Sequence, residues 1–212
     1  MDMIHAVLDF SGPGAVFALE KNGEKIFEVS RLMQRRDAAT LALFMKETLN
    51  QNGLEFENIT HWTVGSGPGS FTGMRIAASL VQGLTYGKTV KSRTVPSAEA
   101  VAAGAGEDKK NSCVIFDGRN REIILLDLKS GQDAILNKEQ ADVFFKANQF
   151  ESFAGMGYDK NAVAQIVPGE VFEKIKWADN LNTEAFFESD NPFDDDLTKL
   201  IYIRPSVVGA KE

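Results

Sequence analysis

The sequence predicts an α/β fold built from two related halves. At its start, short runs of β-branched and aromatic residues separated by turns predict three strands, in IHAVLDF, AVFALE and KIFEVS. Two segments with helical periodicity follow, and the short apolar run HWTVGS between them predicts a buried strand. The order of elements is therefore βββαβα. From Ser112 onward the same order starts again, which indicates an internal duplication.

Two amphipathic helices are predicted in the first half. The first occupies DAATLALFMKETLNQNG, where Asp37 is expected to cap the start and Gly53 to end the helix. The second occupies MRIAASLVQGLTYG and is expected to stop at Gly87. The apolar residues at helical spacing are Ala38, Leu41, Phe44, Met45 and Leu49 in the first helix, and Ile76, Ala77, Leu80, Val81 and Leu84 in the second.

A stretch of glycine and charged residues, GAGEDKKN at residues 104–111, separates the two halves. Before it, TVKSRTV predicts a strand and residues 97–103 predict a small helix. We therefore expect one lobe over residues 1–106 and a second over 107–212, with the last segment as a candidate to return to the first lobe. Within the second lobe the sequence predicts strands in SCVIFDG, EIILLDL, DAIL and FESFAGM, and a helix from Lys138 to Lys146.

The tail of the chain begins with an acidic and aromatic stretch, NTEAFFESDNPFDDD. It is predicted to be a solvated loop that Phe186, Phe187 or Phe193 holds against the body of the protein. The last strand of the chain is predicted in KLIYIRPS.

The composition restricts the function. With 212 residues and a net charge of -7, the surface on average repels phosphate backbones, so any role with nucleic acid is expected to be indirect or shared with a basic partner. Cys113 is the only cysteine, which excludes an intramolecular disulfide and a thiolate zinc cluster. The sequence has neither the pattern of a signal peptide nor a run of about 18 apolar residues. We therefore expect a cytoplasmic protein without a membrane segment.

The loop GPGSFTG, residues 67–73, lies between a predicted strand and a predicted helix. In that place free backbone N–H groups and the helix dipole favour an anion. It is not a Walker A loop, because Met74 and Arg75 follow its last glycine in place of a lysine and a hydroxyl residue. The alternative, which the residues favour, is a tight turn in which Ser70 or Thr72 caps the helix.

The side chains supply little metal or nucleophile chemistry. The two histidines, His5 and His61, are far apart in the sequence, and each is expected to be structural. Cys113 lies in an apolar run and is expected in the core. Asp9, at the end of the first strand, is either a ligand for Mg²⁺-bound phosphate or the acceptor of an Asx turn. The acidic run at residues 194–196 is expected to be solvated.

The stretch VGSGPGSFTGMRIAASLVQGLTYG, from Val64 to Gly87, resembles a signature of the TsaB (YeaZ) family. PSAEAVAA, FDGRNREIIL and IYIRPS resemble further segments of that family, the second of them its Asp-Ala-Arg-type hairpin. The resemblance is strong in the first half and thin between Lys129 and Lys199. It implies the actin-like, sugar-kinase and Hsp70-type ATPase fold, with two related βββαβα lobes.

The resemblance also implies a function. TsaB proteins are partners of the catalytic subunit TsaD in the bacterial machinery that makes threonylcarbamoyladenosine in tRNA, and they resemble degenerate, non-catalytic copies of it. The implied partners are a TsaD-like subunit or a second copy of this chain, a TsaE-like ATPase in the same complex, and tRNA only indirectly. No cofactor is expected. The implied partner-binding residues belong to the two helices of the first lobe and the loop before the second: Leu41, Met45, Ser70, Phe71, Thr72, Met74, Arg75, Ala78, Ser79 and Gln82.

Two segments depart from the family pattern. Where the family has a first turn like Asp-Thr-Ser-Thr, this chain reads DFSGPG from Asp9, which removes a hydroxyl and a backbone donor from a turn that approaches nucleotide phosphate in active members of the fold. Where the family often has His-Ser-Glu, this chain has RDA at residues 36–38. The alternative function is an ATP-dependent phosphotransferase or ATP-binding protein of the same fold, with Asp9 on the metal and the loop from Ser70 to Thr72 on phosphate. The changed first turn argues against it.

Overall fold

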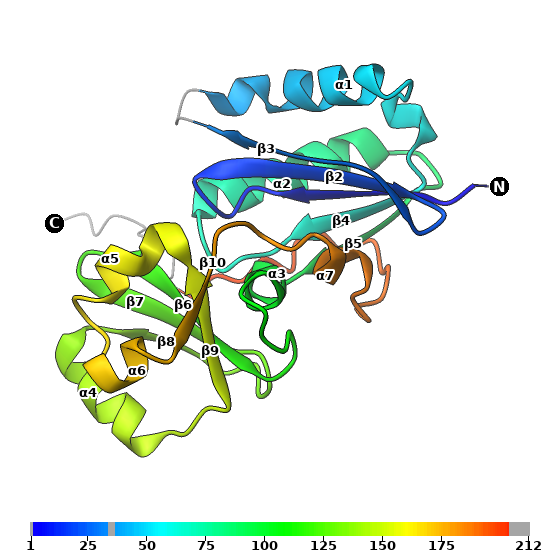
Figure 1. The fold of residues 1–212 in the computed structure, drawn as a ribbon. Coiled ribbons are helices and arrows are strands. Elements are labelled where there is room, and N and C mark those ends of the chain that lie inside the picture. Colours follow the sequence, from blue (N-terminus) through cyan, green and yellow to red (C-terminus); the bar gives the residue numbers. More distant parts are fainter. Residues whose placement is uncertain (1, 34–36, 204–212) are drawn as a thin grey trace, which may run out of the picture. The chain divides into compact units, whose positions relative to one another are not determined.

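The computed structural model describes residues 2–33 and 37–203, and within them the chain forms two compact units (Figure 1). The first unit comprises the described residues up to Ala100 together with Leu181–Leu200, a later segment that returns to it. The second unit comprises Val101–Asn180 and, among the described residues, 201–203. We call the returning segment, Leu181–Leu200, the strap.

The first unit is built on a mixed five-stranded sheet in the order β3-β2-β1-β4-β5. Strands β3, β2 and β1 are antiparallel neighbours, whereas β1, β4 and β5 run parallel. All residues of the central strand β1 are buried, as expected for a strand that is covered on both faces. The strands are β1 (Ile4–Asp9), β2 (Gly14–Lys21), β3 (Glu24–Leu32), β4 (His61–Gly65) and β5 (Lys91–Val95).

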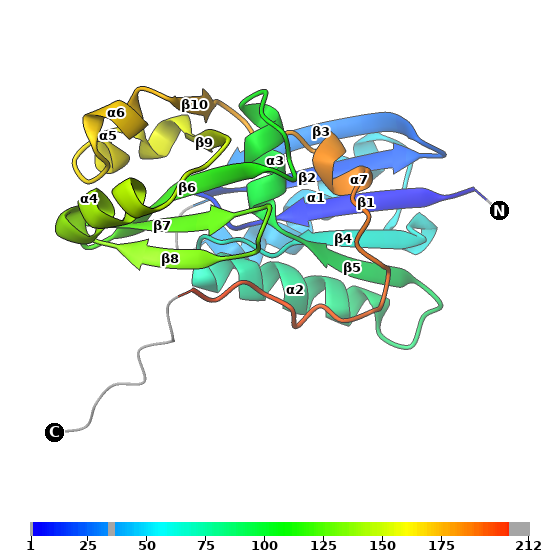
Figure 2. The same cartoon turned by 90° about the horizontal axis from the view of Figure 1, so that it is seen from below.

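Helices α1 (Leu41–Gln51) and α2 (Phe71–Thr85) cover one face of this sheet. Their buried residues share one core cluster with every second residue of the strands, among them Ala6 and Leu8 of β1. The short helix α7 (Glu184–Phe187), which belongs to the strap, lies against the other face, where the ring of Phe187 contacts His5 (Figure 2). The remaining elements of this unit are the 3₁₀ turns η1 (Asp37–Thr40) and η2 (Phe56–Asn58) and the start of α3 (Ser97–Gly104).

The sequence predicted a cap and an end for each of α1 and α2, and three of these four positions agree with the structure. Gly53 and Gly87 adopt the left-handed conformation (φ 68° and 69°) that commonly follows a helix. Ser70 is the N-cap of α2, and its Oγ accepts a hydrogen bond from the backbone N–H of Gly73 at 3.2 Å. The fourth point was wrong, because α1 is preceded by η1 and its N-cap is Thr40, whose side chain makes no capping bond.

The second unit repeats the topology of the first. Its sheet has the order β10-β9-β6-β7-β8, with β6, β7 and β8 antiparallel and β6, β9 and β10 parallel. The predicted α/β fold with two related βββαβα lobes is therefore confirmed. The elements are β6 (Ser112–Arg119), β7 (Glu122–Asp127), β8 (Asp133–Leu136), α4 (Lys138–Ala147), β9 (Ser152–Met156), η3 (Gly157–Asp159), α5 (Lys160–Val163), α6 (Gly169–Phe172) and β10 (Ile175–Ala178).

The tail differs from its prediction in two respects. The acidic stretch contains the helix α7 and is not only a loop, although Phe186 is fully buried and holds it to the first unit as expected. The last strand was predicted over residues 199–206. Residues 199–203 form no strand, so this part of the prediction was wrong. The remainder of that predicted strand lies outside the described residues.

Candidate functional site

The loop between β4 and α2 packs directly against the turn that follows β1. The backbone N–H of Ser70 donates to the carbonyl oxygen of Ser11 at 2.6 Å. Gly67, with φ 90°, precedes a cis bond to Pro68 and gives the loop its tight turn. Together with the Ser70 cap, this geometry confirms that the loop is a turn that starts a helix.

The spacing of the glycines in and beside this loop follows from that close approach. A methyl group on Gly65 would overlap Oδ2 of Asp9, and a methyl group on Gly73 would overlap the carbonyl oxygen of Phe10. A methyl group on Gly69 would likewise overlap the carbonyl oxygen of Ser11. Gly69 and Gly73 thus allow the loop to pack on the backbone of the first turn, and Gly65 leaves room for the carboxylate of Asp9.

Asp9 is the acceptor at the centre of this packing. Its carboxylate is fully buried, and Oδ1 accepts from the backbone N–H and the Oγ of Ser11, at 2.9 and 2.8 Å. Its Oδ2 accepts from Oγ of Ser97 at the start of α3, and that Oγ in turn accepts from the N–H of Gly67 at 3.0 Å. Burial raises the pKa of Asp9, while the bonds from Ser97 and Ser11 oppose the rise. The Asx turn predicted for Asp9 is confirmed, and the residue ties the first turn to the loop and to α3.

Helix α2 has one buried face and one exposed stripe. Thr72, Arg75, Ser79 and Gln82 follow one another at helical spacing, and all four are exposed. Ser70 is exposed as well, and Phe71 is half-buried with the guanidinium of Arg75 3.8 Å from the centre of its ring. Six of the ten residues expected to bind a partner therefore have accessible side chains.

The other four expected partner-binding residues lie in the interior of the first unit. Leu41 and Met45 are fully buried, and Met74 and Ala78 are 1% and 7% exposed. Their apolar periodicity reflects the core-facing side of each helix. These four side chains therefore pack in the core of the isolated chain, and their role in binding a partner stays a prediction. The exposed apolar residue of α1 is Leu43, which falls outside the core periodicity and which sequence reasoning missed.

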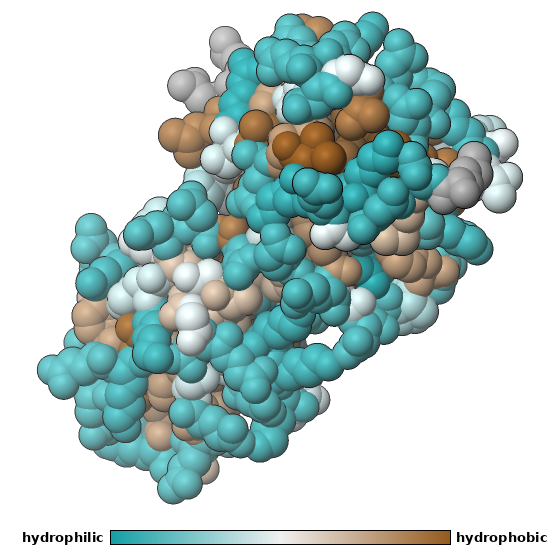
Figure 3. Space-filling model, turned by 45° about the vertical axis from the view of Figure 1, so that its right-hand side comes forward, coloured by the Kyte–Doolittle hydropathy of each residue, from teal (hydrophilic) through white to brown (hydrophobic). Residues whose placement is uncertain are grey.

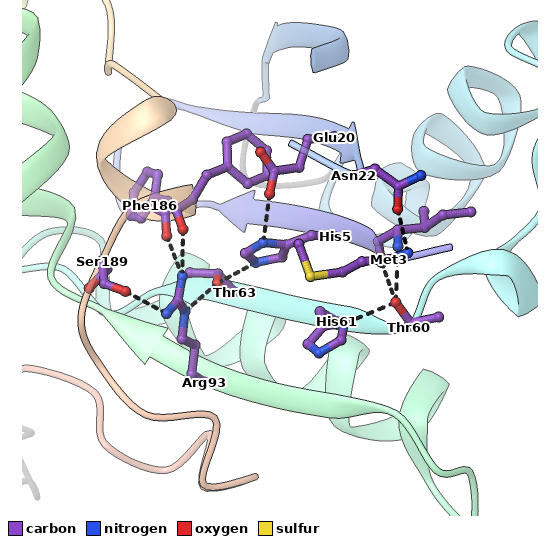
Figure 4. A network of polar contacts seen from close by, with 12 residues as sticks. Met3, His5, Glu20, Asn22, Thr60, His61, Thr63, Arg93, Phe186 and Ser189 are labelled. Carbon is purple, nitrogen blue, oxygen red and sulfur yellow. Dashed lines mark hydrogen bonds and ion pairs between the residues drawn. The ribbon is translucent and has the colours of Figure 1, made fainter. Parts of the chain in front are cut away.

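The opposite face of the first sheet carries a buried polar network (Figure 4). Nε2 of His5 lies 2.8 Å from Oγ1 of Thr63, Nδ1 of His5 lies 3.3 Å from Glu20, and Nε of Arg93 donates to Oγ1 of Thr63 at 2.9 Å. Burial, together with the positive charge of Arg93, lowers the pKa of His5 to about 3. His5 is therefore a neutral, hydrogen-bonded core residue, as predicted. His61 is half-buried, and its Nδ1 lies 2.9 Å from Oγ1 of Thr60.

Sequence reasoning missed Arg93, although it carried a signal. The strand KSRTV places a charged residue in a run that is otherwise buried, and Arg93 is only 4% exposed. A buried guanidinium requires several acceptors. Four of these come from the strap, about 95 residues further along the chain, and no local pattern identifies them.

In the second unit, the carboxylate near the end of the first strand, that of Asp117 in β6, has a different environment. Asp117 accepts from the backbone N–H of Arg119 at 2.8 Å and pairs with its guanidinium at 2.9 Å. Oδ2 of Asp159 accepts from the N–H of Asp117 at 3.2 Å, and burial raises the pKa of Asp159 to about 6. Cys113 is fully buried, as predicted, and burial raises the pKa of its thiol.

The described residues supply neither a metal-binding cluster nor a membrane-crossing helix. Residues 2–33 and 37–203 contain no group of three or more His, Cys, Asp or Glu side chains arranged to hold a metal ion. In the same residues, every helix is too short or too polar to cross a membrane. The surface in Figure 3 is mostly hydrophilic, with a patch of hydrophobic side chains near the top of the view.

Residues 29–182 match the family model described as TsaD, tRNA N6-adenosine threonylcarbamoyltransferase. Among curated proteins, the chain is 31% identical over 118 residues to the tRNA threonylcarbamoyladenosine biosynthesis protein TsaB of Haemophilus influenzae, which covers 55% of this chain and 50% of that protein. It is 26% identical over 117 residues to the TsaB of Escherichia coli, covering 54% and 51%. The matches thus span about half the length of these curated relatives.

Two solved structures have a similar fold. One is described as an uncharacterized protein with similarity to peptidase YeaZ from Pseudomonas aeruginosa; it matches 95% of this chain and 100% of its own with a TM-score of 0.69 at 19% identity. The other is YeaZ from Pseudomonas aeruginosa, which matches 87% of this chain and 89% of its own with a TM-score of 0.65 at 22% identity. The resemblance read from the sequence is confirmed by these relatives.

Proposed function

Because this chain belongs to the family of the tRNA N6-adenosine threonylcarbamoyltransferase model, with TsaB proteins among its relatives, we propose that it is an accessory subunit in threonylcarbamoyladenosine synthesis. In this proposal it has no catalytic site of its own. It binds a TsaD-like catalytic subunit and activates it, and a TsaE-like ATPase joins the same complex. The tRNA contacts this chain only through the partner, in line with its net charge of -7.

The observation that carries the proposal is the exposed stripe of α2. Thr72, Arg75, Ser79 and Gln82 form a continuous row, and Tyr86, 87% exposed, extends it by one more turn. Arginine and tyrosine are enriched among the residues that dominate binding energy at protein interfaces. Leu43 of α1, 55% exposed, adds an apolar contact point on the neighbouring helix. Together these residues suit a protein partner better than a small ligand.

The packing around Asp9 supports an accessory role. In the alternative function, Asp9 and the loop from Ser70 to Thr72 would hold a metal and a phosphate. Here the carboxylate of Asp9 accepts from Ser11 and Ser97, and the loop glycines lie against the backbone of the first turn. Binding a nucleotide phosphate at this place would require the turn and the loop to separate.

The proposal is tested by titrating the chain against the TsaD-like subunit of its own organism in a calorimeter. Ser79→Glu places a charge in the middle of the stripe at an exposed position, where it leaves the core intact. If Ser79 is central to the interface, this variant weakens binding by about 2–4 kcal/mol. Ala78, only 7% exposed, is unsuitable for this purpose because a charge there disturbs folding.

The matched control is Gln132→Glu, which makes the same change in charge at an exposed residue of the β7–β8 turn. It is expected to bind like the original chain. Equal affinity of Ser79→Glu and Gln132→Glu would place the interface elsewhere. A wild-type chain that pairs only with itself, and does not bind the TsaD-like subunit, would defeat the proposal.

A further inference from the structure

The strap crosses the first sheet from one side to the other. At its start, the N–H of Asn182 donates to Ala100, Oγ1 of Thr183 donates to Glu28 of β3 at 2.5 Å, and Glu184 pairs with Lys25 at 2.6 Å. It then passes over the face that carries His5. At the edge of β5, the N–H of Asp195 donates to the carbonyl of Ser92 at 2.9 Å, and Oδ1 of Asp195 accepts the N–H of Ser92 at 2.6 Å. The strap therefore closes the free edge of β5.

Beyond that edge the strap reaches the face that carries α2. Leu197 is 4% exposed and belongs to the same core cluster as Ala77, Ala78 and Val81 of α2, and Leu200 packs against this cluster. Figure 2 shows this end of the strap running along α2. The end of the strap thus shares its hydrophobic core with α2.

Arg93 joins the strap to the sheet with all five of its N–H groups. Nε donates to Thr63, Nη1 donates to the carbonyl oxygens of Ser189 and Asn191 at 2.7 and 2.9 Å, and Nη2 donates to those of Phe186 and Phe187 at 2.8 and 3.0 Å. The ring of Phe193 lies 4.2 Å from the centre of the guanidinium. Four of the five acceptors are therefore backbone atoms of the strap.

This arrangement makes the burial of Arg93 and the position of the strap depend on each other. Arg93 is 4% exposed with the strap in place, and without the strap its guanidinium would keep Thr63 as a protein acceptor and turn its other four donors to water. With the strap in place, the loss of those four carbonyl acceptors would leave a buried charge with few partners, which is strongly unfavourable. We therefore expect the four bonds between the strap and Arg93 to form and to break together.

The rest of the network in Figure 4 fixes the side of Arg93 that faces the sheet. The proton arrangement that pairs every donor with an acceptor has Thr63 accepting from Arg93 and donating to Nε2 of His5, whose Nδ1–H donates to Glu20. His5 is then neutral and adds no second positive charge beside Arg93. The guanidinium is held in one orientation, with its remaining four donors directed at the strap.

We propose that Arg93 is a positioning residue that latches the strap and, through Leu197 and Leu200, holds α2 in the position required for docking on the partner subunit. This inference rests on the proposed function for its partner, but the latch itself is a property of the free chain. Couplings of this kind typically change affinity by about 2- to 30-fold.

Hydrogen exchange of the free chain tests the latch without any partner. Arg93→Lys keeps the charge but has three donors in place of the planar five. Amides of the strap and of α2 are expected to exchange faster in this variant, while those of β1 and β2 keep the exchange rates of the original chain. Phe17→Leu, a change in the same core on β2, is the control; it is expected to lower overall stability without this local pattern. Unchanged exchange in the strap and α2 of Arg93→Lys would overturn the proposal.

Binding to the TsaD-like subunit then tests the connection to docking. Arg93→Lys and Leu197→Ala are each expected to weaken binding by about 2- to 30-fold. The double variant is expected to lose no more affinity than the single variant with the larger loss, because both changes release the same strap. Additive losses would show that the two residues act separately and would contradict the latch.

A second variant covers the case in which Arg93→Lys does not fold. Asp195→Ala removes the side-chain bond of the strap to Ser92 at an exposed position and leaves Arg93 intact. Faster exchange in the strap and α2 is expected here too, and its absence would count against the latch. If the wild-type chain does not bind the TsaD-like subunit, the proposed function fails, whereas the exchange results still decide on the latch.

Discussion

The two units share one topology but differ at the same two points. In both, an aspartate lies at or near the end of the first strand, and its Oδ1 accepts the N–H of the residue two positions later, Ser11 in one case and Arg119 in the other. Asp9 is fully buried and bonded to Ser97, whereas Asp117 pairs with an arginine whose side chain is 80% exposed. The duplicated turn is closed in the first unit and faces solvent in the second.

The second difference lies after the fourth strand. In the first unit this place holds the glycine loop and the 15-residue helix α2, with its exposed stripe. In the second unit it holds η3 and α5, of three and four residues. The close packing of Gly65, Gly69 and Gly73 on the first turn is thus the foundation of a long helix that only one copy has. The comparison teaches that the sequence signature marks a rigid base for α2.

The largest difference between the two units is expected when the glycine at the end of each fourth strand, Gly65 or Gly157, is replaced by alanine. Gly65→Ala forces a methyl group onto the carboxylate of Asp9 and is expected to cost about 3 kcal/mol or more in the free energy of unfolding. Gly157→Ala meets its nearest neighbour, the carbonyl oxygen of Ala178, at 3.4 Å and is expected to cost less than about 1 kcal/mol. Urea unfolding of both variants measures the difference. Equal costs would mean that the first turn is not tightly packed.

The two aspartates provide the next largest contrast. Asp9→Ala leaves the N–H and Oγ of Ser11 and the Oγ of Ser97 without their acceptor in the interior, and a loss of about 2–3 kcal/mol is expected. Asp117→Ala removes a pair with an exposed partner, and a loss of about 1 kcal/mol or less is expected. Thermal and urea unfolding of the two variants side by side would refute the contrast if Asp117→Ala were the more damaging change.

A pH effect with a defined sign is expected from Asp159 in the second unit. Its pKa is about 6 in the folded state and near 3.8 in the unfolded chain, so between these values the folded state retains a proton that the unfolded state has released. The contribution of Asp159 to stability therefore falls as the pH rises through this window. Asp159→Asn keeps an acceptor for the N–H of Asp117 and is expected to gain about 1–2 kcal/mol at pH 7 and nothing below about pH 4. A gain that does not change with pH would rule out this origin.

The smallest change in stability is expected at the tip of the β6–β7 hairpin in the second unit. Asn120 and Arg121 connect β6 and β7 with φ values of 52° and 61°, a conformation that glycine adopts with less strain. The β2–β3 hairpin of the first unit has Asn22 and Gly23 at its tip. Arg121→Gly is therefore expected to stabilise the chain by up to about 1 kcal/mol, whereas Gly23→Ala is expected to destabilise it by a similar amount. Chemical denaturation distinguishes the two signs.

Local patterns in the sequence predicted the elements well because each element has local causes. The hydroxyl of Ser70 and the left-handed Gly53 and Gly87 act within a few residues of their own positions, and periodicity placed α1 and α2. The same periodicity correctly marked Met45 as a residue on the buried face of α1, whereas its predicted role in partner binding came from the family resemblance and stays a prediction. The family resemblance implied a partner, but it did not tell which side of each helix faces solvent.

What the sequence did not reveal depends on distant contacts. Arg93 binds carbonyl groups of Phe186 and Ser189, and backbone acceptors leave no trace in residue identity. For the same reason, the acidic part of the strap was predicted to be a solvated loop. The close approach of Gly73 to Phe10 likewise joins segments about 60 residues apart. The glycines are evident in the sequence, but the segment on which they pack is not.

The central claim is that this chain is a non-catalytic subunit on which a TsaD-like enzyme depends, and modification of adenosine in tRNA tests it most directly. The TsaD-like subunit and the other components from the same organism are assayed with the wild-type chain, with Ser79→Glu, with Gln132→Glu and without the chain. We expect threonylcarbamoyladenosine only with the wild-type chain and Gln132→Glu, and a strong reduction with Ser79→Glu. Full modification without the chain, or equal modification with both glutamate variants, would contradict the account.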